Sequence, residues 1–147
     1  MLSNEQIASV KNKIKKGESA LIVLNSSGRI LLDDKRTGVA AAIEFYQTQG
    51  QIPQDIFVFD KVVGKGAAAI FALCGAEYVY GQIMSSHAID MFEGVDIDWE
   101  CDKEVDVIIG KNNLPICPIE DCVLNIDDPN LAYEAILKKL ESLKNKG

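Results

Sequence analysis

The sequence has one histidine and no Cys-x-x-Cys pair, and these shortages bear on two classes of site. Catalytic triads and zinc sites usually include a histidine beside their other members, and His87 is the only one in the chain. The four cysteines, at positions 74, 101, 117 and 122, are irregularly spaced. We therefore expect reduced thiols, not a disulfide framework or a zinc site, and we predict no cofactor.

The sequence also lacks an apolar run long enough to cross a membrane. The longest, from Ala67 to Ala76, ends at Glu77, whereas a spanning helix needs about 20 apolar residues. The first residues have neither the basic region nor the apolar run of a signal peptide. With 15 basic against 22 acidic residues and a net charge of −7, nonspecific binding to nucleic acid is disfavoured. We expect a cytoplasmic protein that binds neither membrane nor nucleic acid.

What the sequence does contain is an alternation of apolar strands and amphipathic helices. Strands are expected at residues 20–24, 29–32, 56–59, 78–84 and 95–100, the last with alternating acids typical of a protected edge. Helices are expected after Ser3, at about 39–49, after Asp60, after Ser85 and from Pro129. This order predicts an α/β fold, a three-layer α/β/α sandwich around a mixed five-stranded sheet. We expect a single domain over residues 1–147, with an N-terminal helix within 1–17 and a C-terminal loop and helix within 112–147.

The stretch from Ile56 to Gly75 is the most informative about function. It predicts a short strand that runs directly into a helix, with Asp60 as the N-cap. Lys61 and Lys65, four residues apart, would share one face of the first turn, and Gly64 would allow close approach of a ligand. Helix N-termini that follow a strand are where open α/β sheets bind anions. The sequence therefore predicts an anion site here.

Two other interpretations of this stretch stay open. The glycines at 64 and 66 can simply let the helix pack tightly. The lysines, which are unfavourable in the first turn of a helix, can be neutralised by an acid of the protein itself, such as Glu120.

A second candidate site is Cys117-Pro-Ile-Glu120. A thiol at a helix N-terminus has a depressed pKa and can act as a nucleophile or bind a metal. In this hypothesis Cys117 is the catalytic nucleophile, Glu120 orients it, and Lys61 or Asp60 assists.

Three segments resemble motifs of a known family, the domain of unknown function DUF1893. They are Arg36-Thr-Gly38 before a helix, Asp60-Lys-Val-Val-Gly-Lys65, and Cys117-Pro-Ile-Glu120 with Asp127-Asp-Pro129. The resemblance covers roughly Gly17 to Pro129 and implies a cytidine deaminase-like fold.

In the deaminase superfamily a His/Cys-x-Glu motif opens the helix after the hairpin, and Pro-Cys-x-x-Cys opens the helix after the next strand. Together they hold zinc, and the glutamate shuttles protons. Here the corresponding places are Arg36–Ala41 and Asp60–Gly64, which contain none of these ligands. The resemblance therefore implies a pocket without the zinc ligands, and our first hypothesis is that it binds a small anionic, nucleotide-like ligand. The candidate ligand-binding residues are Arg36, Gly38, Asp60, Lys61, Gly64 and Lys65. An enzyme that uses Cys117, and a structural or protein-interaction domain, are the two alternatives.

Overall fold

The computed structural model describes residues 2–52, 54–112 and 114–146. Residues 1 and 147, at the ends of the predicted terminal segments, and residues 53 and 113 lie outside this part of the chain. Within it the elements are α1 (Asn4–Lys15), β1 (Leu21–Asn25), β2 (Ile30–Asp34), α2 (Ala40–Phe45), a π-helical turn η1 (Tyr46–Gly50), β3 (Ile56–Val63), α3 (Lys65–Leu73), β4 (Ala76–Ser85), α4 (Ser86–Gly94), β5 (Asp98–Val105), α5 (Pro118–Val123) and α6 (Pro129–Lys146).

The five strands form one mixed sheet in the order β2-β1-β3-β4-β5. β1 runs antiparallel to both β2 and β3, whereas β3, β4 and β5 are parallel. The hairpin arises because a short polar turn joins β1 to β2, and the parallel pairs arise because α3 and α4 carry the chain across the sheet. The predicted mixed five-stranded sheet is confirmed, with β5 at an edge.

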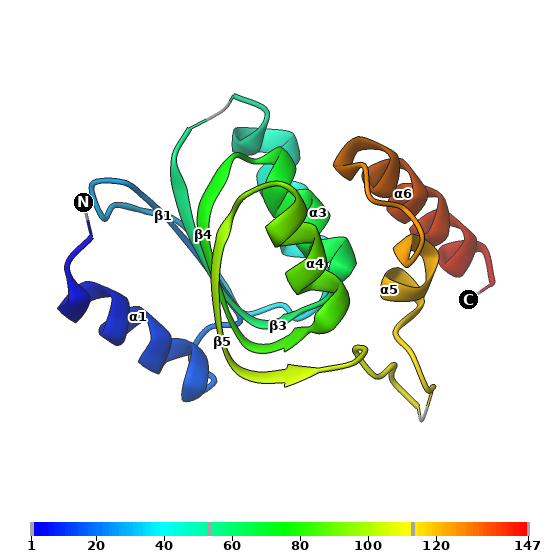
Figure 1. Cartoon of the computed structure of the whole chain (residues 1–147), viewed down its shortest axis with the longest axis horizontal. Helices are drawn as coiled ribbons and strands as arrows, with labels where there is room; N and C mark the ends of the chain where they lie inside the picture. Colours follow the sequence, from blue (N-terminus) through cyan, green and yellow to red (C-terminus); the bar gives the residue numbers. More distant parts are fainter. Residues whose placement is uncertain (1, 53, 113, 147) are drawn as a thin grey trace.

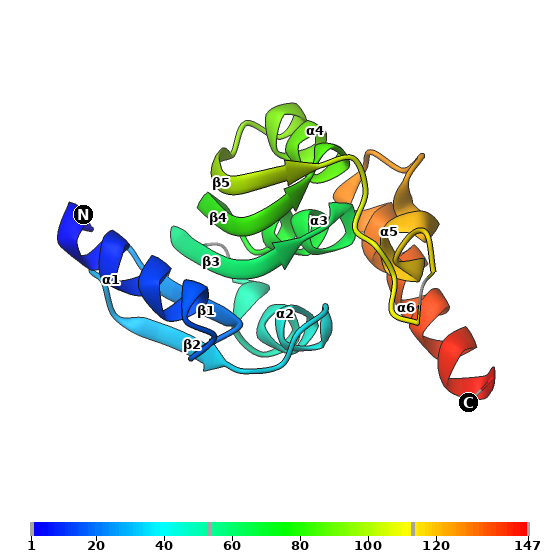
Figure 2. The same ribbon diagram turned by 90° about the horizontal axis from the view of Figure 1, so that it is seen from below.

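Helices cover both faces of this sheet. α1 packs on one face of the sheet, and α2, α3 and α4 pack on the other face (Figures 1 and 2). Successive residues of a strand point alternately to the core under α1 and to the core under α2–α4. In β1, for example, Ile22 and Leu24 point to α1, and Leu21 and Val23 point to α2–α4. The core under α1 consists of Leu2, Ile14, Ile22, Leu24, Phe59 and Tyr80.

The last two helices lie on the outer side of α3, away from the sheet, in both views (Figures 1 and 2). Ala132 and Ile136 of α6 are fully buried there. A Cβ atom on Gly66 would lie 2.7 Å from Ile119 Cγ2 and 3.3 Å from Ile136 Cδ1, so the glycine permits this contact. Within the described residues, no helix, the 18-residue α6 included, is long and apolar enough to cross a membrane.

β3 continues four residues beyond its predicted end at Phe59. Asp60 pairs with Leu21 of β1 inside the sheet, and the strand ends at Val63. The expectation that Asp60 is the N-cap of the following helix is therefore wrong; the N-cap is Gly64, which has no side chain to offer. The valines after Lys61 favour an extended strand, and they pair with β4.

Two other boundaries differ from expectation. β5 begins at Asp98, not at residue 95, because Asp96 adopts a left-handed conformation (φ 60°) that a strand cannot continue through. The second helix ends as an α-helix at Phe45 and continues as η1. The predicted helix starts after Ser3 and Ser85 are confirmed, each with its serine as N-cap, and Pro118 is the first residue of α5.

Candidate functional site

A buried carboxylate, that of Glu120, joins three elements of the fold. Glu120 lies in the first turn of α5 and is only 2% exposed. Its Oε1 accepts hydrogen bonds from the Lys65 N–H, at 3.3 Å, and from the Ser85 hydroxyl. Its Oε2 accepts one from the Ile108 N–H, at 2.5 Å. Because a carboxylate is costly to bury without such partners, these donors fix the position of Glu120.

Two of the three donors stand at helix N-termini. Lys65 is the first residue of α3, and the N-cap of that helix, Gly64, makes no side-chain cap. Ser85 is the N-cap of α4, and its Oγ also accepts the Ala88 N–H at 3.1 Å. The positive ends of two helix dipoles therefore converge on Glu120, an arrangement that favours negative charge.

The side chain of Lys65 extends from the same place toward the end of α5. Lys65 is 4% exposed, and its Nζ donates to the Leu124 carbonyl at 2.8 Å and to Asp127 Oδ1 at 3.1 Å. The sequence allows an acid of the protein, such as Glu120, as the partner of this lysine. The structure divides that role: Glu120 accepts the backbone N–H of Lys65, and Asp127 accepts its ammonium.

Lys61 lies apart from this group. It is exposed in β3, so the expectation that it shares a helical face with Lys65 is wrong. No ion pair to its ammonium is found among the described residues.

Arg36 is exposed in the segment between β2 and α2. Its guanidinium bonds Glu44 Oε2 at 2.5 Å and Asp34 Oδ2 at 2.8 Å, and hydrogen bonds from the guanidinium to these two carboxylates raise its pKa. Gly38, two residues later, has φ +88°, and a Cβ added there would have open space around it. The structure therefore brings Gly64, Lys65 and Glu120 together. Arg36 lies outside this group and forms ion pairs with Asp34 and Glu44.

Asp60 is a second buried carboxyl group. Its partner across the sheet, Leu21, belongs to the core beneath α2–α4, so Asp60 lies on the same face as α3. Burial raises the pKa of Asp60 to about 8, although the N–H groups of Lys61 and Val62 favour the charged form. A buried carboxyl with a perturbed pKa is a candidate for a functional group.

The cysteines form no comparable group. Cys117 is the half-buried N-cap residue of α5 and its side chain makes no cap hydrogen bond. The Glu120 carboxylate, predicted to orient it, is bonded to α3, α4 and Ile108 instead. Burial raises the pKa of Cys122, and that of Cys74 to about 12. In residues 2–52, 54–112 and 114–146, no three or more His, Cys, Asp or Glu side chains are placed to hold a metal ion.

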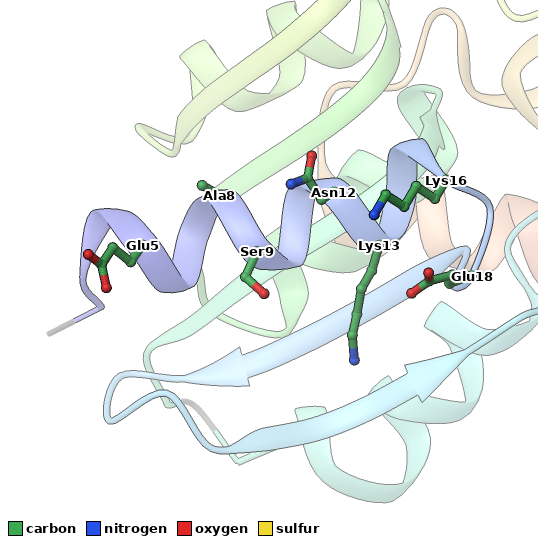
Figure 3. Close-up of a pocket in the computed structure, with 7 residues that line it drawn as sticks. All are labelled: Glu5, Ala8, Ser9, Asn12, Lys13, Lys16 and Glu18. Carbon is green, nitrogen blue, oxygen red and sulfur yellow. The ribbon is translucent and has the colours of Figure 1, made fainter.

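Glu120 lines none of three surface hollows in the described part of the chain. One of about 500 Å³ follows the outer side of α1, on the opposite face of the sheet; Figure 3 shows its lining residues, Glu5, Ala8, Ser9, Asn12, Lys13, Lys16 and Glu18. Another, of about 410 Å³, lies between the end of α4 and Asp127. Glu120 and two of its donor residues, Lys65 and Ser85, are themselves buried.

Three members of this group do not follow from the sequence. Ser85 is correctly predicted to cap α4, but its second bond, to Glu120, has no local signal. Ile108 and Leu124 contribute only backbone atoms, and their side chains give no indication of this role. The one usable signal is a lysine in the first turn of a helix, because that position calls for a nearby acid.

Comparison with known proteins then identifies the family. The family described as TM1506, domain of unknown function (DUF1893), matches residues 9–140. The chain belongs to the DUF1893 family. The crystal structure of a DUF1893 family protein (TM1506) from Thermotoga maritima, at 2.70 Å resolution, is similar with a TM-score of 0.82 and 22% sequence identity. The likeness covers 95% of this chain and 92% of that chain.

DUF1893 membership confirms the resemblance found in the sequence and extends it beyond Gly17 and Pro129. At 22% identity the structural likeness shows a shared fold. No curated protein matches the chain.

Proposed function

We propose that this DUF1893 domain binds a small anionic, nucleotide-like ligand at the N-termini of α3 and α4. The observation that carries the proposal is the Glu120 carboxylate, which accepts hydrogen bonds from Lys65, Ser85 and Ile108 in a buried site. These donors are two backbone N–H groups and a hydroxyl, a set that suits a carboxylate or phosphate oxygen equally well.

The charge near these donors supports an anion of higher charge than a carboxylate. Lys65 supplies both a backbone N–H and, on the same residue, a buried ammonium. The ammonium forms an ion pair with Asp127, whose side chain is 98% exposed. If this ion pair were broken, water could solvate the Asp127 carboxylate. A phosphate at the Glu120 position would offer Lys65 a stronger partner.

A cytidine deaminase-like fold is part of the same proposal. α2 follows the β1–β2 hairpin and α3 follows β3, and these are the two helices that carry the zinc motifs in that superfamily. The residues at their starts, Arg36–Ala41 and Asp60–Gly64, contain no histidine or cysteine. Elemental analysis of the purified protein should find far less than one zinc per chain; a full equivalent would contradict the metal-free site.

The experiment that tests anion binding uses Glu120→Ala, which removes the internal carboxylate and leaves its donors. Acetate or inorganic phosphate should raise the melting temperature of this variant more than chloride does at equal ionic strength. An anion present at about 100 times its Kd should raise the free energy of unfolding by about 2.7 kcal/mol. The control is Glu134→Ala, an exposed acid of α6. An equal response to all three salts would contradict the proposal.

A structural role is the second candidate, and the buried bonds of Lys65 to Leu124 and Asp127 favour it. In that case the group only fastens α5 and α6 to α3, and acetate, which restores the missing carboxylate, stabilises Glu120→Ala whereas phosphate does not. The salt comparison above therefore separates the two candidates.

A further inference from the structure

α6 carries an apolar stripe that is longer than the surface on which it packs. Apolar side chains recur at helical spacing along it, at positions 132, 136, 140 and 143. Ala132 and Ile136 are fully buried against the domain, whereas Leu143 is 39% exposed. The C-terminal end of α6 points away from the sheet in both views (Figures 1 and 2). The described part of the chain therefore leaves the end of this stripe partly uncovered.

The same end of α6 is basic. Residues 137–145 contain three lysines, at 138, 139 and 144, and one acid, Glu141. Lys138 and Lys144 are exposed, and no ion pair to these three lysines is found among the described residues. Beside them Leu137 is 38% exposed. A surface that combines leucines with ammonium groups favours a partner surface that combines apolar groups with carboxylates.

A hollow of that complementary chemistry lies at the other end of α6. Its volume is about 410 Å³, and it is lined by Asp90, Met91, Gly94 and Val95 at the end of α4 and by Asp127, two residues before α6. Val95 is 37% exposed, and the Asp90 and Asp127 side chains are exposed. The negative end of the α4 dipole adds to these two carboxylates. The hollow therefore suits an ammonium group on an apolar stem.

The position of these two surfaces on one helix determines which partner they fit. α6 has 18 residues, so its ends lie about 27 Å apart. If two copies of the chain place their α6 helices antiparallel, the basic end of each helix lies beside the acidic hollow of the other copy. A two-fold axis forms both contacts at once. A parallel arrangement would instead bring the lysines of the two copies together.

The dipole of α6 accounts for only part of this pattern. Lysines are favourable in the last turn of a helix, so Lys144 suits α6 without a partner. Lys138 lies in the middle of the helix, where the dipole gives no such advantage. The dipole also gives no reason for the exposure of Leu137 and Leu143.

We infer that the outer face of α6 and the end of α4 form an interface between two copies of this chain. In the dimer the α6 helices lie antiparallel, and Lys138 and Lys144 of each copy face the carboxylates at the end of α4 in the other copy. Leu137 and Leu143 are covered by the same contact. The interface uses none of the residues around Glu120, so it stands apart from the proposed anion site.

The test measures self-association of the full chain by sedimentation equilibrium, at low salt and at concentrations up to about 500 μM. The wild type should form a reversible dimer that weakens as salt is added. The double substitution Asp90→Lys with Glu93→Lys reverses the charge at the end of α4, and Lys138→Glu with Lys144→Glu reverses that of α6. Each should raise the Kd of the dimer more than about tenfold, because like charges then meet.

An equal mixture of the two reversed variants should dimerise about as tightly as the wild type, because opposite charges again face each other. This rescue would also show that both variants are folded. Leu137→Ser, which alters no charge, should weaken the wild-type dimer as well. The controls are Lys35→Glu and Glu77→Lys, at exposed positions on other elements, which should leave the Kd unchanged.

Three results would overturn the interface. The first is a wild type that stays monomeric over the whole concentration range. The second is a dimer that neither charge reversal nor Leu137→Ser weakens. The third is a mixture of folded reversed variants that dimerises no better than each variant alone.

Discussion

Glu120 and Lys65 each cap the helix that carries the other. Glu120 of α5 accepts the N–H of Lys65 at the start of α3, and the ammonium of Lys65 donates to the Leu124 carbonyl at the end of α5. One helix receives a negative charge at its positive end, and the other receives a positive charge at its negative end. This reciprocal cap leads to the first two predictions below.

Glu120→Ala should lower the free energy of unfolding by about 3 kcal/mol, because it leaves buried donors without an acceptor. Glu120→Gln should cost less, since its amide oxygen can still accept. Urea denaturation measures both. Glu134→Ala, at an exposed position of α6, should change stability by less than about 0.5 kcal/mol. A Glu120→Ala loss no larger than that of Glu134→Ala would disprove the role of the buried carboxylate.

Lys65→Met keeps most of the buried stem and removes the ammonium that bonds Leu124 and Asp127. We expect a loss of about 1–3 kcal/mol, mainly from the buried carbonyl interaction. Asp127→Ala should cost less than about 0.5 kcal/mol, because Asp127 is 98% exposed. Equal losses in the two variants would mean that the ion pair, not the carbonyl, is what matters.

Gly66→Ala should destabilise the protein by about 1–3 kcal/mol through overpacking, since its Cβ would lie 2.7 Å from Ile119 Cγ2. The matched control is Gly94→Ala at the end of α4, where a Cβ would meet nothing within 4 Å. That substitution should be neutral or stabilising by up to about 1 kcal/mol. Thermal unfolding distinguishes them, and a harmless Gly66→Ala would show that α5 and α6 adapt freely.

The buried Asp60 carboxyl group should make the stability of the protein depend on pH, and the direction of this dependence follows from its raised pKa. Because burial raises the pKa of Asp60 to about 8 from its ordinary 3.8, the folded state holds a proton that the unfolded state has released between these values. Stability therefore falls as pH rises through this window, by at most about 1.4 kcal/mol per pH unit, and levels off outside it. Asp60→Asn should flatten this dependence, so it should be more stable than the wild type at about pH 8 and closest to it at about pH 4. If the free energies of unfolding of the wild type and Asp60→Asn changed with pH in parallel, Asp60 would not be a buried, protonated carboxyl group.

The hypothesis of a nucleophilic Cys117 is tested by alkylation. Cys74 is fully buried and has its pKa raised to about 12, so it should react slowest in the folded protein. A catalytic Cys117 should react with iodoacetamide more than about tenfold faster than Cys74 at neutral pH. Mass spectrometry of labelled peptides gives both rates. Similar rates would remove the hypothesis.

Most of the sheet could be predicted from sequence because its signals are local. The apolar run of β1, the turn after Asn25 and the serine before α4 each act within a few residues. The end of β3 could not be predicted, since Asp60 is a typical N-cap residue and would place Lys61 in the following helix. Pairing with β1 and β4, which no local pattern reveals, keeps them in the strand.

The candidate site was predictable only in part for the same reason. The positions of Gly64 and Lys65 at a helix start follow from the sequence, and the need for an acid follows from the lysine. The partners lie far along the chain: Glu120 is 55 residues from Lys65 and 35 from Ser85. Such separations are set by the packing of α5 and α6 on α3, which Gly66 permits.

These separations also set an order in time. As the chain is synthesised from its N-terminus, α3 and α4 are complete well before Glu120 is added. Until then the first N–H of α3 has only water as an acceptor, and the Ser85 hydroxyl has no carboxylate to bond. A late segment of the polypeptide therefore completes the ends of helices made much earlier, and a chain cut short before α5 would carry both helix starts open.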